Sequence, residues 1–134
     1  MCGLLAIVET PDSQAAASSH APRGEQLIDR LTHRGPDERG TLILDHAWLG
    51  HRRLAIVSPE CGQQPIAHDS IAWVSNSEIY NHAELRSLCD SVPTSRCDSA
   101  VIGPVLAKFG IEGIAKLQGQ FAIVVQHTDR PHWI

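Results

Sequence analysis

The order in which short apolar runs and helix-like segments follow one another is the feature that most constrains how this chain folds. Short β-prone runs occupy residues 3–8, 41–45, 47–50, 54–57, 71–75 and 121–126. Helical patterns are concentrated in the second half, at residues 80–89, 99–109 and 111–116, with an earlier one at 24–33. Strands that mostly precede helices, with a last strand at the end, indicate an α+β sandwich rather than an alternating parallel sheet.

Local signals refine several of these boundaries. Pro22 is placed to open the first helix, which must stop before the glycine- and proline-containing stretch at residues 33–40. Asn81 is a suitable N-cap for the helix that follows it. Gly103 and Pro104 weaken the interior of the helix predicted at residues 99–109. The small, polar residues 12–21 are expected to form a surface loop.

Composition excludes several classes of protein. A chain of 134 residues with 43% hydrophobic and 19% charged residues is typical of one soluble globular domain. The net charge of −4 provides no basic surface for nucleic acid or an anionic bilayer. No apolar run reaches the length of a membrane span, and the first ten residues lack the basic segment of a signal peptide. We therefore expect a cytoplasmic protein.

Cysteine and histidine spacing argues against a metal site. No close pair of cysteines faces a second close pair, and the eight histidines are dispersed. Without an export signal, the cysteines are expected to be reduced thiols, and Cys61, Cys89 and Cys97 to be inert.

Cys2 stands directly behind the initiator methionine and is followed by glycine. Removal of Met1 makes Cys2 the N-terminal residue, and a free α-amine, with a pKa of about 8, can act as general base for the thiol of the same residue. Taken alone, the position is equally compatible with a small residue that simply packs. Four further segments decide between these interpretations.

These segments follow in order along the chain: LTHRGPDERG at residues 31–40, LGHRRLAIV at 49–57 with CGQQPI at 61–66, NSEIYNHAELR at 76–86, and CDSAVI at 97–102 followed by LQGQFAIVV at 117–125. Together with the MCG start they resemble the class II glutamine amidotransferases, which are N-terminal-nucleophile hydrolases. Within that group the chain resembles the N-terminal domain of glutamine-hydrolysing asparagine synthetases, because Pro36 stands where the sugar-aminating synthases carry tyrosine. The resemblance covers nearly the whole chain.

The resemblance implies a fold and a set of site residues. The fold is a four-layer αββα sandwich of antiparallel sheets, or a version abbreviated at the C-terminus. Cys2 is the implied nucleophile, and the Asn76 side chain with the Ser77 backbone N–H is the implied oxyanion hole. The implied glutamine-binding residues are Arg53, Val57, Asn76, Glu78 and Asp98.

Each of these residues also has a structural interpretation. Arg53 resembles a solvated arginine at a strand start, Glu78 a turn residue, and Asp98 the N-cap of the next helix. Arg52 is the expected bystander of the arginine pair.

Several other residues in these motifs are expected to have structural roles. Arg34, Gly35 and Asp37 are predicted to form a tight loop beneath the site. His33, His51 and His82 are expected to be packed or surface histidines, because the mechanism needs none of them.

Two departures from the family pattern leave a second function open. Ser77 stands where asparagine synthetases carry glycine, and it would strain the backbone if that position needs a positive φ. Residues 1–134 are expected to be a truncated glutaminase domain without the synthetase domain, since no nucleotide-binding loop is present. The alternative to an enzyme is a non-catalytic subunit that binds or regulates a synthetase partner.

The resemblance also implies what the site requires. Hydrolysis of glutamine needs no cofactor, and ATP and Mg²⁺ belong only to a missing or separate synthetase domain. The implied partners are L-glutamine and a synthetase domain or subunit that receives ammonia.

Overall fold

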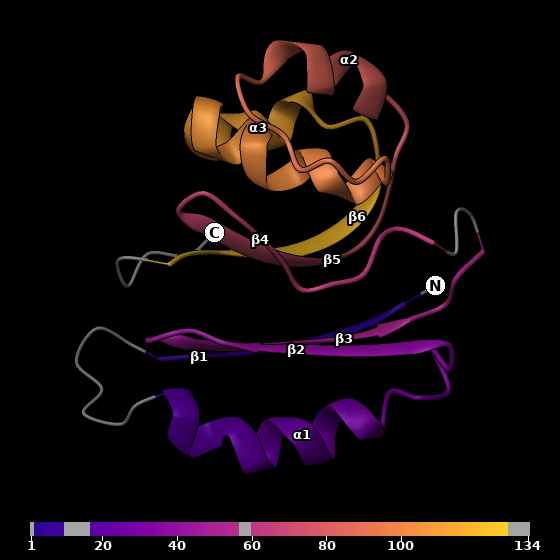
Figure 1. Cartoon of the computed structure of the whole chain (residues 1–134), viewed down its shortest axis with the longest axis vertical. Coiled ribbons are helices and arrows are strands. Elements are labelled where there is room, and N and C mark those ends of the chain that lie inside the picture. The colour runs from indigo at the N-terminus through magenta and orange to yellow at the C-terminus, as the bar shows by residue number, and fades with distance from the viewer. Residues whose placement is uncertain (1, 10–16, 57–59, 129–134) are drawn as a thin grey trace.

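The computed structural model describes residues 2–9, 17–56 and 60–128. Two three-stranded antiparallel sheets face each other, and helices cover the outer face of each (Figure 1). Helical segments from the first half of the chain lie beneath the first sheet, and those from the second half lie above the second. The predicted four-layer αββα sandwich is therefore confirmed.

The first sheet contains β1 (Gly3–Val8), β2 (Glu38–Ile43) and β3 (Ala47–Arg53), in the order β1-β3-β2. Its outer face is covered by α1 (Ala21–Asp29), which follows a short 3-10 helix, η1 (Ala17–His20). Pro22 lies in the first turn of α1, where its missing N–H costs no hydrogen bond.

The second sheet contains β4 (Ile66–His68), β5 (Ile71–Ile79) and β6 (Gly119–His127), in that order. Above it lie α2 (His82–Leu88) and α3 (Ile102–Phe109), with the 3-10 helices η2 (Asp98–Val101) and η3 (Gly110–Lys116) before and after α3.

Each sheet buries one tryptophan against a helix glycine. Trp48 of β3 packs on Gly24 of α1, where a Cβ would be about as close as 2.6 Å to the indole. Trp73 of β5 packs in the same way on Gly103 of α3, and its Nε1 donates to Ser99 O at 3.0 Å. The glycines let helix and sheet approach closely enough to bury both rings completely.

The layer between the sheets is made from small apolar side chains. Ala47, Leu49, Ala72 and Val74 form its buried centre. Because side chains alternate between the two faces of a strand, the even-numbered residues of β5 and the odd-numbered residues of β3 point into this layer. Continuing each strand toward its end brings polar side chains into the same space.

Some predicted elements end elsewhere. The strand predicted at residues 54–57 is wrong in its described part, because β3 ends at Arg53 and residues 54–56 have no regular structure. The loop predicted at 12–21 is wrong at its C-terminal end, where η1 and α1 begin, and residues 12–16 lie outside the described part. Pro104 does not weaken α3, since it occupies the first turn of that helix.

Asn81 takes the N-cap position of α2 without capping it through its side chain. Its amide instead donates to Lys116 O and accepts from Gln118 N, both at 3.0 Å. These bonds tie the start of α2 to the segment that leads into β6.

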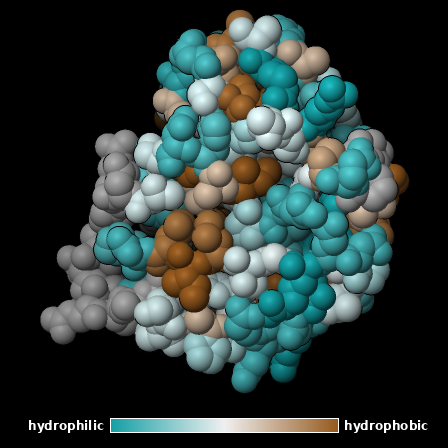
Figure 2. All heavy atoms as spheres, in the orientation of Figure 1, coloured by the Kyte–Doolittle hydropathy of each residue, from teal (hydrophilic) through white to brown (hydrophobic). Residues whose placement is uncertain are grey.

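The visible surface is mostly hydrophilic, with an apolar area at the level of the two sheets (Figure 2). Every helix in the described part of the chain is too short or too polar to cross a membrane. Across the same residues, no three His, Cys, Asp or Glu side chains converge as the ligands of a metal ion would.

Candidate functional site

Strand alternation brings distant residues to one end of the layer between the sheets. Cys2 precedes β1 on the face that carries Leu4 and Ala6, and Arg53 ends β3 on the face of Ala47 and Leu49. From the opposite sheet, Asn76 and Glu78 continue the face of Ala72 and Val74. The interior is therefore apolar at one end and polar at the other.

Cys2 and Asn76 meet across this layer although 74 positions separate them in sequence. The Cys2 backbone nitrogen donates to Asn76 Oδ1 at 2.9 Å. This bond engages the acceptor end of the amide and orients it, which leaves the Nδ2 donors to face another group. The thiol is half-buried and receives the Leu54 backbone N–H at 3.4 Å.

A turn before β2 holds this arrangement from below. Arg34 Nε donates to the Cys2 carbonyl oxygen at 3.1 Å, and Asp37 Oδ2 accepts the Ala55 N–H at 2.7 Å. Gly35 lies against the backbone of Arg52 and Arg53, where a Cβ would overlap with it. The predicted loop beneath the site is confirmed, and its polar groups fix both Cys2 and the segment after β3.

The two neighbouring arginines of β3 point to opposite faces. Arg52 faces α1 and pairs with Asp29 at 2.5 Å, so it takes no part in the site. Arg53 faces the interior and is only 5% exposed, where it pairs with Glu38 Oε2 at 3.0 Å. Its Nη2 also donates to the Cys61 carbonyl oxygen. Arg53 is therefore a buried, oriented guanidinium and not a solvated one.

The other two predicted binding residues with described positions differ in exposure. Glu78 lies near the end of β5 with an exposed side chain. Asp98 begins η2, and its Oδ2 accepts the Ile79 N–H at 2.8 Å instead of capping the helix through its side chain. Asp98 thus sits beside the end of the strand that carries Asn76 and Glu78. Val57, the remaining predicted contact, lies outside the described residues.

Ser77 does not carry the strain that a positive φ would bring. It lies inside β5, and Asp69 is the non-glycine residue with a positive φ in the described part of the chain. The Ser77 Oγ is 3.0 Å from Ser75 Oγ on the helix-facing side of the sheet. The Ser75 N–H points away from β6 to Gln64 Oε1 at 2.5 Å, and the Ser77 N–H, two residues on, points to the same edge of β5.

His51 links the two sheets as a neutral side chain. It is 2% exposed, and its Nε2 lies 3.2 Å from Ser75 O, so this nitrogen must be the protonated donor. Burial lowers the pKa of His51 to about 4. His51 is thus a packed histidine, as the sequence predicted.

Cys2, the oriented amide of Asn76 and the buried guanidinium of Arg53 therefore lie at one end of the layer between the two sheets. A family model described as "Glutamine amidotransferase domain" matches residues 1–134. The chain belongs to this family.

Curated relatives of this amidotransferase domain carry synthetase names. The chain is 38% identical over 131 residues to "Asparagine synthetase [glutamine-hydrolyzing] 2" of Oryza sativa subsp. japonica. It is 39% identical over 131 residues to "Asparagine synthetase [glutamine-hydrolyzing] 3" of Arabidopsis thaliana. Both matches cover 96% of this chain and 22% of the relative.

Sequence reasoning missed two contributors to this candidate site. The Leu54 N–H reaches the thiol through its backbone, which carries no residue-specific signal. Glu38 pairs with Arg53 across the β2–β3 register, in which these two residues are directly opposite. Its position next to the HRGPD motif was visible, but the pairing depends on a register that periodicity alone does not define.

Proposed function

We propose that this chain hydrolyses the side-chain amide of L-glutamine to glutamate and ammonia, with Cys2 as nucleophile after loss of Met1. The observation that carries the proposal is the contact between the Cys2 nitrogen and Asn76 Oδ1 at 2.9 Å. Once Met1 is removed, this nitrogen becomes the α-amine, already next to the thiol and beside an oriented amide.

The proposed chemistry follows from these groups. The α-amine takes the thiol proton, and Sγ attacks the glutamine Cδ to form a tetrahedral intermediate. Asn76 Nδ2 and the Ser77 N–H donate to its oxyanion. The proton returns to the leaving nitrogen, ammonia departs, and water then hydrolyses the thioester to glutamate. No cofactor takes part in this sequence.

Substrate recognition is assigned to the charged residues at the same end of the interlayer. Arg53 pairs with the glutamine α-carboxylate, while Glu78 and Asp98 face its α-ammonium. Val57 is proposed as a further contact from the segment after β3.

The ammonia is proposed to supply an asparagine-synthetase-like amidation. The named relatives support this assignment, and the chain spans 22% of their length. ATP and Mg²⁺ would be used only by a synthetase domain or subunit that receives the ammonia.

The test compares Cys2→Ala with Cys89→Ala in protein whose intact mass confirms loss of Met1. Ammonia release from glutamine should fall to background in Cys2→Ala, because this variant keeps the backbone nitrogen that is bonded to Asn76 but lacks the attacking thiol. Cys89→Ala should keep wild-type activity, since Cys89 packs beside the helical core. Undiminished hydrolysis in Cys2→Ala contradicts the nucleophile assignment. If processed wild-type protein releases no ammonia, the proposed hydrolysis is contradicted and the alternative, a non-catalytic subunit, is favoured.

A further inference from the structure

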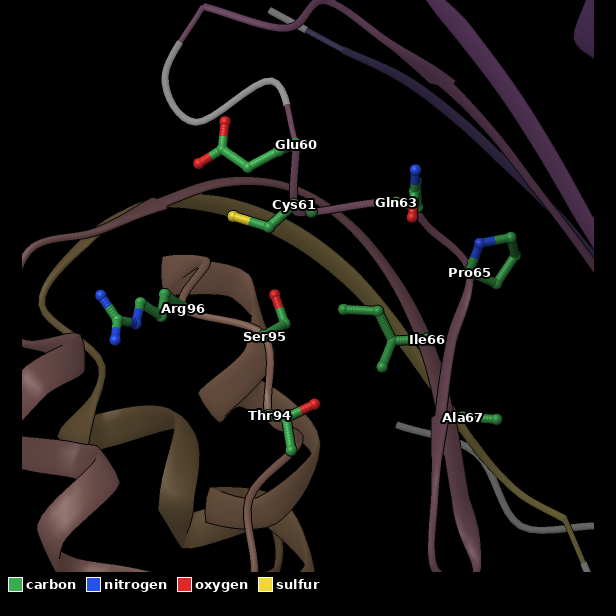
Figure 3. A pocket seen from close by; sticks show the side chains of 10 residues that line it. Glu60, Cys61, Gln63, Pro65, Ile66, Ala67, Thr94, Ser95 and Arg96 are labelled. Carbon is green, nitrogen blue, oxygen red and sulfur yellow. The ribbon is translucent and has the colours of Figure 1, made fainter.

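Two cysteines that the proposed reaction does not use lie close together, and one of them, Cys61, lines a cavity of about 560 Å³. The cavity is lined by residues 60–63 and 65–67 on one side and by residues 94–96 on the other. Figure 3 shows the Cys61 side chain directed to the side of the cavity where Ser95 and Arg96 lie. Cys97 follows directly after Arg96 in the chain.

The packing of Cys97 places its sulfur next to the Cys61 segment. A Cβ on Gly62 would overlap with Cys97 Sγ, so this sulfur lies against the backbone beside Cys61. The Cys61 thiol is within hydrogen-bonding reach of Cys97. Both residues are half-buried free thiols in the reduced protein.

The two thiols differ in accessibility to a reagent. Burial, followed by the charge and hydrogen bonding of the neighbouring Cys61, raises the pKa of Cys97 to about 11. Cys97 is therefore a protonated thiol near neutral pH, whereas Cys61 opens onto the cavity. An oxidant that enters the cavity reaches Cys61 first. Once Cys61 is capped, two of the causes that keep Cys97 protonated are removed.

We propose that Cys61 and Cys97 form a reversible intramolecular disulfide by exchange with a low-molecular-weight disulfide. The Cys61 thiolate attacks one sulfur of the reagent, which forms a mixed disulfide and releases one thiol. Cys97 loses its proton and attacks the Cys61 sulfur, which releases the second thiol. The protein loses two hydrogen atoms, and the reagent disulfide is reduced to two thiols.

The disulfide joins two segments that touch the proposed recognition residues. The Cys61 carbonyl accepts from Arg53 Nη2, and Cys97 immediately precedes Asp98. The crosslink holds that carbonyl on Arg53, so the guanidinium is less free to turn toward a substrate carboxylate. This consequence rests on the proposed function, whereas formation of the disulfide does not.

The experiment treats the reduced chain of residues 1–134 with oxidised glutathione and maps its thiols after trypsin digestion. Cleavage after arginine and lysine places the four cysteines in separate peptides, with Cys61 in residues 54–86 and Cys97 in residues 97–108. We expect one crosslink between these two peptides, which a dithiol reductant reverses. In Cys97→Ser, the Cys61 peptide should stop at the glutathione adduct, and in Cys61→Ser the Cys97 peptide should remain unmodified. Cys89→Ser should crosslink as wild type does.

A crosslink from Cys61 to Cys2 or Cys89 overturns the proposal. Separate glutathione adducts on Cys61 and Cys97 in the wild-type protein overturn it as well. The wild-type map gives this result even if a serine variant does not fold. In fractions with Cys2 free, the KM for glutamine should be severalfold higher in the crosslinked protein than in the reduced protein. An unchanged KM contradicts the effect on Arg53. A crosslink in protein that releases no ammonia in either state supports the disulfide and refutes the proposed function.

Discussion

The region around Cys2 and the region around Arg53 are built from different kinds of contact. Around Cys2, the contacts to Asn76 and Leu54 are hydrogen bonds of neutral groups, and Arg34 supplies one further bond to the backbone carbonyl. Around Arg53, charged side chains already have protein partners, namely Glu38 and the Cys61 carbonyl for Arg53, and the Ile79 N–H for Asp98.

Under the proposed function, this difference separates a preformed nucleophile region from a recognition region that must exchange partners. The neutral contacts need no substrate to be satisfied, so they fix the geometry of the attacking atom in advance. The charged groups must share or replace Glu38 and backbone partners when glutamine arrives. Substitutions in the first region should therefore lower kcat, and substitutions in the second should raise KM.

Among substitutions that keep Cys2, the largest effect is expected for Asn76→Asp. The aspartate keeps an oxygen to accept the Cys2 nitrogen but replaces the Nδ2 donor with negative charge. Loss of one oxyanion donor lowers kcat by roughly 10²–10³-fold, while KM changes little. Steady-state kinetics of processed protein checks this. A rise in KM with unchanged kcat would move Asn76 into the recognition region.

The pH dependence of the free energy of unfolding tests whether burial keeps His51 neutral between the sheets. Its folded pKa of about 4 lies below the ordinary value of 6.5, so the unfolded chain binds its proton first as pH falls. The free energy of unfolding should therefore decrease between about pH 6.5 and 4, by up to roughly 3 kcal/mol from this residue. His51→Gln should flatten that dependence in urea unfolding, whereas His33→Gln, at an exposed position, should not. Equal slopes in wild type and His51→Gln would contradict the burial argument.

Arg53→Ala should raise the KM for glutamine by about 10–100-fold, because a charge-assisted contact worth about 1.5–3 kcal/mol is removed. Arg52→Ala is the matched control, since Arg52 faces α1 and pairs with the exposed Asp29. It should leave KM unchanged within about twofold, as surface ion pairs contribute little. If Arg52→Ala proves the more damaging change, the assignment of the inner face of β3 is incorrect.

Ser77→Gly should have the smallest effect, a change in kcat of less than about twofold. The backbone at this position is extended, so glycine relieves no strain and only removes the contact between the Ser77 and Ser75 hydroxyls. The comparison with wild type is made in processed protein at saturating glutamine. A tenfold rise in kcat would show that the serine displaces the oxyanion donor during turnover.

The layers of the sandwich were predictable from local patterns, but several strand ends were not. Residues 54–57 look like a strand because all four are apolar and the last two, Ile56 and Val57, are β-branched. In the fold, the Leu54 N–H turns to Cys2 Sγ and the Ala55 N–H to Asp37, so these donors leave the sheet ladder. β4 was missed because it has only three residues, too few to show an alternation.

The candidate site residues could be predicted from the family resemblance more than from the periodicity of the sequence. A contact between residues 2 and 76 has no local signature, and only the ordered motifs indicated that these residues belong together. Strand alternation predicts that the side chains of residues 52 and 53 point to opposite faces of the sheet, but it does not predict which face is the inner one. That choice is decided by α1, which presents Asp29 to Arg52 and leaves Arg53 for the interior.

The contact between Cys2 and Asn76 also sets an order in time. Cys2 is synthesised before its acceptor, which follows 74 residues later on β5, in the other sheet. The β6 strand that pairs along the whole of β5 is made later still. A nascent chain therefore carries the proposed nucleophile without the amide to which its backbone is bonded, and the two halves of the candidate site come together only when both sheets have formed and docked.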